Sequence, residues 1–522
     1  MKTFLQKLVK ENIYLSLKEG ELSVKVPKTG VDPEIIGEIK AKKTELIEYL
    51  SKLADPDQIP TLSQQENYSL SYVQKRIWDL SRLDKGSIAY NVPGTIEFGA
   101  ALDKDRFMQA LNAGIDRHES LRTVFRLNES GKVRQYILSR EDLNFEIDYF
   151  DFSNVEDKEE KAGEFINKDA YLPFDLENGP LFRAALFKIE EEKYIFYYNM
   201  HSIAADGESI EIFTREAMVF SEALKDGSSP SLPELKIQYK DFANWQSKCL
   251  ENNRLKEHKN YWSTHLSGNL PILDLPNQKE RPATKTFSGK LLGTNFSIET
   301  SNKIKSFVND KGGNLFMGLM TLWKVFLYFQ TSQKDLVIGT QALGRDHPDL
   351  EGQIGPYINM IAIRSRINPN ESFIQFYEKV KEVVSKSYSF QMYPYEKIIQ
   401  DIDFSLDPSR NPIFDTAMVL QREEQVLEDF QIAGIKKGSI LELGIGKKYV
   451  DTVVAKYDVE IDFRELGGCL WYNINYNTDL YDRETIIDLM VSFRTLSNFL
   501  VDHLSKPISS ISTVDLFTSE EV

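Results

Sequence analysis

The stretch KYIFYYNMHSIAADG, residues 193–207, decides the fold and carries an informative set of polar residues. Its first eight residues are mostly aromatic and aliphatic, which predicts a buried β-strand. The preceding stretch FDLENGPLFRAALFKI, residues 174–189, predicts a neighbouring strand. This strand pair leads directly into His201, Ser202, Asp206 and Gly207.

Around this stretch, helical and strand patterns alternate from residue 62 onward. Residues 302–332 predict one helix, DLVIGTQ (335–341) a buried strand, and residues 482–503 a final helix. YDVEIDFRELGGCLWYNINYN, residues 457–477, predicts a hairpin about Gly467-Gly468. The alternation predicts α/β lobes.

The first 52 residues form a separate pattern. A short amphipathic helix precedes YLSLKEGELSVKV (14–26), which predicts two strands around a turn at Glu19-Gly20. Asp32-Pro33 then opens a second helix, with the acid as its N-cap. Because such a unit has a thin core, we interpret it as a binding unit, the alternative being a mere appendage.

Composition and charge exclude several classes of protein. The length of 522 residues predicts two or three domains. A net charge of −16 argues against nucleic acid as a partner. The start shows no secretory signal, and no stretch is apolar enough to cross a membrane. The two cysteines lack metal-ligand spacing, so we expect no metal site and a cytoplasmic location.

Seven ordered segments carry a family resemblance. They are LSYVQKRIWDL (70–80), DRHESLRTVF (116–125), HSIAADG (201–207), YKDFANWQ (239–246), IGPYINMIAIR (354–364), YPYEKII (393–399) and SRNPIFDTAMVLQ (409–421). Together they resemble the core motifs of condensation domains of nonribosomal peptide synthetases, over about residues 60–515. The first two look more like the subclass that accepts an L-configured donor. Residues 1–52 resemble the small N-terminal docking domains at the start of some synthetase chains.

The resemblance implies an α/β (α+β) fold of two chloramphenicol-acetyltransferase-like lobes in a V, preceded by the helix–hairpin–helix docking domain. It implies a tunnel in which the amine of one carrier-bound residue attacks the thioester of another. Phosphopantetheine is then supplied by donor and acceptor carrier proteins, and no cofactor is bound. The implied domains are a docking domain at 1–53, a linker at 54–61, an N-lobe at 62–235, a C-lobe at 236–507, and a linker at 508–522 towards a following domain.

The chain departs from the family at one position of its central motif. Family members place two adjacent histidines here, and the second imidazole does the chemistry. Ser202 stands in that second position. An imidazole is neutral and basic at pH 7, whereas a serine hydroxyl is not an unaided base. His201, one residue earlier, is expected either to be packed and structural or to reach the tunnel.

The sizes of the catalytic effects involved leave two interpretations of the serine at position 202. A general base typically contributes ~10²–10⁴-fold, while positioning two reactants supplies effective molarities of ~10⁵–10⁸ M. Condensation that is slow or specialised is therefore one hypothesis. A catalytically inactive module that gates carriers or recruits another enzyme is the alternative. A stand-alone acyltransferase using coenzyme A is disfavoured by the docking unit and the linker-like tail.

The remaining site predictions follow the resemblance. Asp206 is expected to hold its loop through an arginine, either Arg117 or Arg345. Gly207 is expected to allow close backbone approach beside an N–H that faces the oxyanion, or to be a plain turn glycine. The predicted tunnel residues are Asn359, Ser409 and Trp245, of which Asn359 and Trp245 also suit a core.

The docking unit predicts a partner surface. Its hairpin offers a strand edge with Lys18, Lys25 and Lys28. A short acidic tail of an upstream synthetase subunit is expected to add a strand along this edge. The alternative is that the lysines keep the edge soluble.

Overall fold

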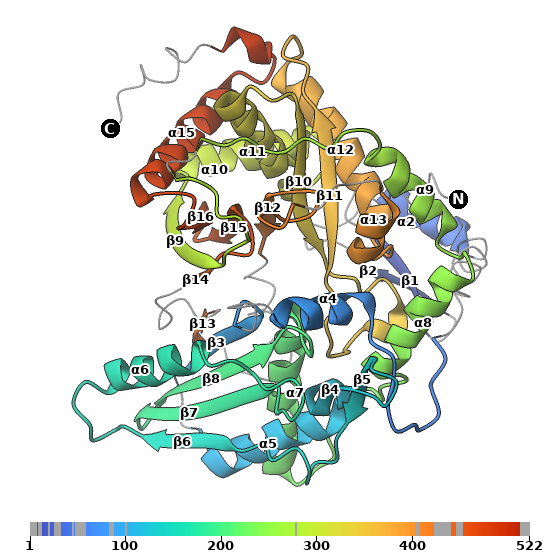
Figure 1. Ribbon diagram of the computed structural model, residues 1–522, viewed down its shortest axis with the longest axis vertical. Helices are drawn as coiled ribbons and strands as arrows, with labels where there is room; N and C mark the ends of the chain where they lie inside the picture. The colour runs from blue at the N-terminus through green and yellow to red at the C-terminus, as the bar shows by residue number, and fades with distance from the viewer. Residues whose placement is uncertain are drawn as a thin grey trace.

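The computed structural model describes most of the chain between residues 59 and 511. The described ranges are 59–82, 88–99, 102–276, 279–402, 407–421, 440–444 and 453–511, together with residues 8, 13–18, 21–25, 33–43 and 46 of the N-terminal unit. Figure 1 shows two lobes, one above the other, with the N-terminal unit at one side.

The N-terminal unit contains the predicted hairpin and second helix. Strands β1 (Tyr14–Lys18) and β2 (Glu21–Lys25) pair in antiparallel register, and helix α2 spans Pro33–Ala41. Its buried core consists of Leu8, Ile13, Ile39 and Leu46. The side chains of Lys18 and Lys25, and all of Lys28, lie outside the described residues.

The first lobe is built on a five-stranded sheet in the order β13-β3-β8-β7-β6. Its strands are β3 (Asn91–Phe98), β6 (Ile147–Asp151), β7 (Phe182–Glu190), β8 (Lys193–His201) and β13 (Ile440–Gly444). A separate hairpin pairs β4 (Thr123–Leu127) with β5 (Val133–Ile137). The predicted strand pair is confirmed, although its first strand begins at Phe182 rather than at residue 174.

Alternating side chains of the central strands explain how helices cover both faces of this sheet. Phe196 packs with helices α5 (Lys104–Arg117) and α7 (Gly207–Asp226), whereas its neighbour Tyr197 packs with α6 (Lys158–Ala170). Neighbouring residues of a strand point to opposite faces, so a strand buried on both sides reads as continuously apolar.

The second lobe is built on a seven-stranded sheet in the order β11-β10-β12-β15-β16-β9-β14. Its strands are β9 (Ser288–Asn295), β10 (Asp335–Ala342), β11 (Asn359–Arg366), β12 (Thr416–Leu420), β14 (Val453–Val454), β15 (Val459–Leu466) and β16 (Cys469–Asn477). Its main helices are α10 (Ile298–Lys311), α11 (Leu315–Thr331), α12 (Phe373–Ser389) and α15 (Arg483–Asp502). The predicted strand at 335–341, the hairpin at 457–477 and the final helix are confirmed.

The prediction of one helix over 302–332 is wrong, because α10 and α11 are separate helices. The break lies at Gly312 and Gly313, whose φ angles are 65° and 148°. These angles suit glycine and end α10, after which Asn314 caps α11 by accepting from the backbone N–H of Met317.

The lobes are joined by helices and by one exchanged strand. Four helices lie between the sheets or beside them, namely α4 (Tyr72–Ser81), α8 (Tyr239–Glu251), α9 (Lys256–His265) and α13 (Tyr395–Asp401). Three 3₁₀ turns complete the described elements, namely η1 (Glu119–Arg122), η2 (Pro348–Leu350) and η3 (Ile508–Ser510). β13 lies within the range predicted for the second lobe, yet it pairs with β3 of the first.

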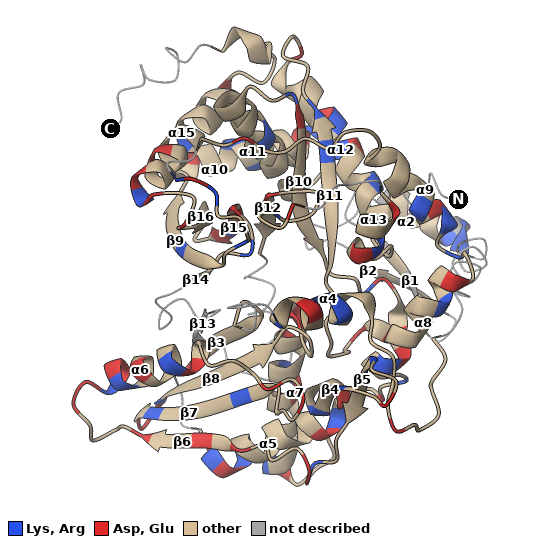
Figure 2. Cartoon of the chain, in the orientation of Figure 1, with Lys and Arg blue, Asp and Glu red and all other residues tan. Residues whose placement is uncertain are grey.

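The distribution of charged residues and the hydropathy of the helices are as follows. Figure 2 shows acidic and basic residues interspersed along both lobes. No helix among the described residues is long and apolar enough to cross a membrane.

Candidate functional site

His201 is the last residue of β8 and lies inside the first lobe. Its side chain is 1% exposed and packs edge-on against Phe174, with ring centroids 5.8 Å apart. Its Nδ1 accepts a hydrogen bond from the backbone N–H of Ile203 at 3.3 Å. This bond requires an unprotonated Nδ1, so the geometry assigns the neutral ring's proton to Nε2. The packing favours a structural role for His201 over a place in the tunnel.

Ser202 follows the end of the strand and is half-buried. Its backbone N–H and its hydroxyl both donate to the carbonyl oxygen of Tyr90, at 2.8 and 2.9 Å. The hydroxyl proton is therefore committed to Tyr90, and the oxygen keeps its capacity to accept a hydrogen bond.

Asp206 holds the motif to the second lobe. Its carboxylate accepts two parallel hydrogen bonds from the guanidinium of Arg345, both at 2.9 Å. It also accepts from the backbone N–H groups of Tyr357 and Ile358 at 3.0 and 3.2 Å. Burial works to lower the pKa of Arg345, but the Asp206 carboxylate outweighs it and the pKa is raised. We call this arrangement of Asp206, Arg345 and the two amides the clamp.

The same carboxylate starts helix α7. Asp206 is the N-cap, and its Oδ1 accepts from the backbone N–H of Ser209 at 2.9 Å. The Ser209 hydroxyl accepts in turn from the backbone N–H of Asp206 at 3.2 Å. One carboxylate thus fixes both the loop after His201 and the first turn of the helix.

Arg117 is not the partner of Asp206. Its Nε donates to Glu216 at 3.0 Å, and the same carboxylate oxygen contacts Nε2 of His118 at 2.7 Å. Of the two arginines that the sequence left open, the structure therefore selects Arg345.

Gly207 occupies the first position of α7 and is exposed. A Cβ built at this position would meet no atom within 4 Å, and its φ angle lies outside the left-handed region. Close packing therefore does not explain why a glycine stands at this position, and the space beside its Cα is open. The predicted role of a neighbouring N–H at the oxyanion stays a prediction.

The predicted tunnel residues do not form one group. Asn359 donates to the carbonyl oxygens of Gln391 and Tyr393 at 2.7 and 2.8 Å and accepts from the N–H of Tyr395 at 3.0 Å. These three bonds leave one acceptor site on its side chain. Asn359 and Trp245 both line one pocket beside α8.

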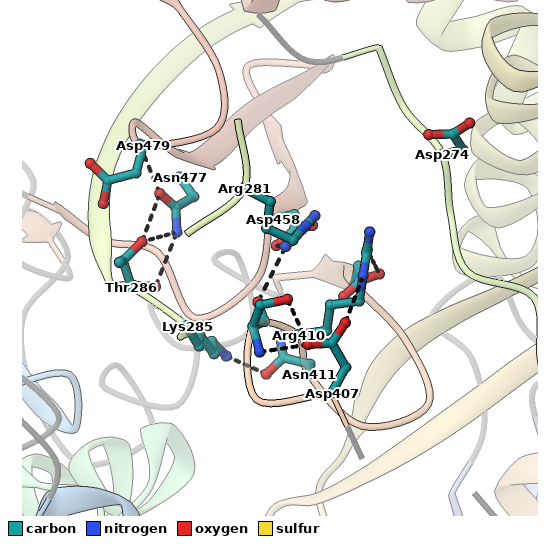
Figure 3. A network of polar contacts seen from close by, with 12 residues as sticks. Asp274, Arg281, Lys285, Thr286, Asp407, Arg410, Asn411, Asp458, Asn477 and Asp479 are labelled. Carbon is teal, nitrogen blue, oxygen red and sulfur yellow. Dashed lines mark hydrogen bonds and ion pairs between the residues drawn. The ribbon is translucent and has the colours of Figure 1, made fainter. Parts of the chain in front are cut away.

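Ser409 lies in a turn apart from that pocket. Its N–H and its hydroxyl both donate to Asp407 Oδ1, at 2.8 and 2.7 Å. Its carbonyl oxygen accepts from Arg281 at 3.3 Å, which joins it to the polar network of Figure 3. The structure therefore gives Ser409 a local structural contact.

Sequence reasoning missed the residues of the second lobe that reach the motif. Phe287 belongs to the same buried cluster as Ile203 and Tyr90. Lys456 places its ammonium 5.1 Å from the centroid of the Tyr90 ring. No motif spacing links Phe287 and Lys456 to the motif. They are distant in the sequence and come near it only because segments of the second lobe pack against the first.

Comparisons with known proteins give consistent matches. A family model described as Condensation domain matches residues 64–522, and one described as TubC N-terminal docking domain matches residues 1–52. Tyrocidine synthase 3 of Brevibacillus parabrevis is 30% identical over 454 residues, which cover 87% of this chain and 7% of that protein. Bacitracin synthase 3 of Bacillus licheniformis is 30% identical over 464 residues, which cover 89% of this chain and 7% of that protein. The chain thus spans less than a tenth of the length of these two curated relatives.

Two solved structures share the fold. A complex of the X-domain and OxyB from teicoplanin biosynthesis matches with a TM-score of 0.73 and 20% identity, covering 87% of this chain and 98% of that one. The first condensation domain of the calcium-dependent antibiotic synthetase, in complex with substrate analogue 2a, matches with a TM-score of 0.69 and 16% identity. This match covers 86% of this chain and 99% of that one.

Proposed function

The chain belongs to the condensation-domain family, as its motifs predicted, and from this we propose that it forms amide bonds in nonribosomal peptide synthesis. The amine of a carrier-bound aminoacyl group attacks the thioester of a carrier-bound acyl or peptidyl donor. The thioester C–S bond breaks, the new C–N bond forms, and the amine proton passes to solvent or to the leaving thiolate.

The intact clamp is the observation that carries this proposal. The carboxylate of Asp206 accepts two guanidinium bonds, contacts two backbone amides of the second lobe and starts α7. A buried ion pair is costly to break from one side, so these contacts fix the motif loop against the second lobe. The loop geometry is therefore kept while the second imidazole is replaced.

The residues present support catalysis by positioning rather than by general base. Ser202 cannot accept the amine proton, and His201 is buried with its Nδ1 already engaged. A free amine is a competent nucleophile towards a thioester, and holding both reactants in line supplies effective molarities of ~10⁵–10⁸ M. We therefore propose slow condensation, lacking the ~10²–10⁴-fold contribution of a general base.

Finer features of the proposal follow the family. The donor is L-configured, and both acyl groups arrive on phosphopantetheine arms of separate carrier proteins. The N-terminal unit binds the tail of an upstream subunit along one edge of its hairpin, with Lys18, Lys25 and Lys28 selecting an acidic tail, and the match to a docking-domain family supports this. An acidic tail peptide is expected to bind the full chain more weakly as salt is raised.

A second candidate function is a recruitment or gating module without condensation chemistry. Ser202 favours it, because its hydroxyl proton is committed to the carbonyl of Tyr90. A fold relative of this chain is described in complex with another protein, OxyB.

One assay separates the two functions. Donor-loaded and acceptor-loaded carriers are mixed with the chain, and the condensed product is measured by intact mass. We expect product from the parent chain and a rate ~10²–10⁴-fold higher for Ser202→His, because an imidazole restores the proton acceptor.

Two further variants make the result interpretable. Ser202→Ala is expected to condense at the same rate as the parent. His201→Ala is expected to lower the rate only through loss of folded protein, which its lower melting temperature would reveal. Absence of product from the parent and from all three variants, with native carriers and acyl groups, would contradict the proposed condensation and favour the recruitment function.

A further inference from the structure

Two segments of the second lobe cross onto the first lobe beside Ser202. The backbone N–H of Ala455 donates to the carbonyl oxygen of Phe287 at 3.1 Å, so the two segments run together. Phe287 packs in the cluster that contains Tyr90 and Ile203. The carbonyl of Tyr90 is the acceptor for Ser202, so this crossing adjoins the central motif through Tyr90.

Three cations meet at the crossing. Lys456 places its Nζ 5.1 Å from the Tyr90 ring centroid. Lys285 donates to the carbonyl oxygen of Lys456 at 2.5 Å and to the side-chain oxygen of Asn411. Arg76, on α4, lies 5.3 Å from the ring centroid of Tyr395, and its charge acts on both lysines. We call Arg76, Lys285 and Lys456 the cation cluster.

The described carboxylates nearby do not balance this cluster. Glu396 contacts Arg76 at 3.4 Å. Asp458 pairs with Arg281, and Asp415 pairs with Arg410 at 2.6 Å, so each carboxylate already has an arginine partner. Figure 3 shows Lys285 at the edge of this polar network, bonded to Asn411. No described carboxylate lies within ion-pair distance of either lysine, and Glu460 acts on Lys456 from farther away.

Burial and the charge of Arg76 lower the pKa of both lysines. Burial, and next the charge of Arg76, lower the pKa of Lys285 to about 7, while Asp458 and Asp415 act in the opposite direction from farther away. Burial also lowers the pKa of Lys456, against the opposing charge of Glu460, and Arg76 lowers it further. An anion between them would offset this repulsion and raise both pKa values.

The side chains of the cluster are partly exposed to solvent. The side chain of Arg76 is 25% exposed, and Lys285 and Lys456 are each half-buried. The lysines keep donors available, since the described residues give Lys456 Nζ a ring contact and no acceptor.

From this geometry we propose that Arg76, Lys285 and Lys456 bind a carboxylate carried by one of the two acyl substrates. This inference rests on the proposed function, since it deepens it by naming the substrate class. A carboxylate on the acyl group is favoured over the phosphate of the arm, because the cluster adjoins the motif at which the thioester must lie. The phosphate lies at the opposite end of the arm from that thioester.

A binding measurement tests the inference without requiring turnover. Succinyl-pantetheine thioester, which carries a carboxylate but no phosphate, is titrated into the full chain by calorimetry. Its neutral counterpart, in which an amide replaces the carboxylate, is titrated in parallel. We expect the acidic thioester to bind at least tenfold more tightly than the amide.

Variants locate the site. In Lys456→Met the two thioesters should bind equally, and Lys456→Gln repeats the test should the methionine variant fold poorly. Lys290→Met is the matched control, because Lys290 carries the same charge on nearby strand β9 but is exposed. This control should keep the full preference.

Three outcomes would overturn the inference. The first is equal or undetectable binding of the two thioesters to the parent. The second is a preference that persists in Lys456→Met and Lys456→Gln. The third is displacement by inorganic phosphate without any preference for the carboxylate, which would assign the cluster to phosphate. A failed condensation assay alongside an intact binding preference would contradict the proposed function and leave this inference standing.

Discussion

Lys324 lies in the middle of α11 and is completely buried in the second lobe. Its Nζ donates to the carbonyl oxygens of Ile363 and Leu336, at 2.7 and 3.3 Å. Burial lowers the pKa of Lys324 to about 7, while the charge of Asp335 acts in the opposite direction. An ammonium that no described carboxylate pairs with therefore occupies the core at low pH.

The consequence for stability is a pH-dependent penalty. The folded pKa lies below the unfolded value near 10.4. The penalty is therefore fully present below about pH 7 and disappears as the pH rises to the unfolded pKa. We expect Lys324→Met to raise the free energy of unfolding by about 1–4 kcal/mol at pH 6, with the gain shrinking between pH 7 and 10.5.

Urea unfolding at several pH values measures this difference. Lys386→Met serves as the control, because Lys386 is 59% exposed and pairs with Glu382 on the surface. Its effect should stay within about 0.5 kcal/mol. A gain for Lys324→Met that does not change with pH would contradict the explanation.

For single residues, the sequence predicted which side chains belong to the site more successfully than it predicted their contacts. Asp206 and its need for an arginine followed from the motif, but the choice of Arg345 over Arg117 needed the fold. Both arginines flank polar motifs, and no spacing rule relates residues 139 positions apart. Tyr90, the acceptor for Ser202, carried no sequence signal for the same reason.

The break between α10 and α11 is the clearest feature at the scale of the elements. A Cβ at Gly313 would lie 2.2 Å from the hydroxyl of Tyr377, on α12, whereas a Cβ at Gly312 meets nothing within 4 Å. The break thus lets α12 approach the turn closely. The two glycines are adjacent and both have positive φ, so they form a natural comparison.

We expect Gly313→Ala to destabilise the protein by several kcal/mol, since a backbone penalty of about 1 kcal/mol adds to the clash with α12. Gly312→Ala should cost about 1 kcal/mol, from its left-handed backbone alone. Thermal unfolding of the two variants measures both values. Equal losses would mean that the contact with Tyr377 relaxes without cost.

Helices and strands were predicted well where the apolar pattern was long. The strand before His201 and the hairpin at 457–477 follow directly from their patterns. The single helix over 302–332 was a wrong prediction, because the apolar pattern continues across the Gly312-Gly313 pair while the backbone turns.

For the whole molecule, the clamp couples the two lobes. Arg345 and Asp206 are 8% and 6% exposed, so removal of one leaves the other buried without its charge partner. The sequence predicted two lobes and a docking unit from the family resemblance. It did not predict which contacts hold the lobes together, because these contacts join distant segments.

We expect Arg345→Met to lower the free energy of unfolding by about 3–5 kcal/mol and to slow condensation, because the motif loop loses its anchor. Arg366→Met is the control, since Arg366 is 72% exposed in its pair with Asp335 and should cost less than about 1 kcal/mol. Denaturant unfolding followed by the condensation assay measures both effects. Normal stability with Arg345→Met would show that the amides of Tyr357 and Ile358 suffice.

The exchanged strand β13 has a consequence for synthesis on the ribosome. Residues 440–444 complete the sheet of the first lobe by pairing with β3, whose residues are made about 340 positions earlier. The first lobe emerges with one edge of its sheet uncovered and keeps that edge until most of the second lobe has been translated. An open edge is a template for pairing with other chains, so the nascent protein is most exposed to misassembly during this interval.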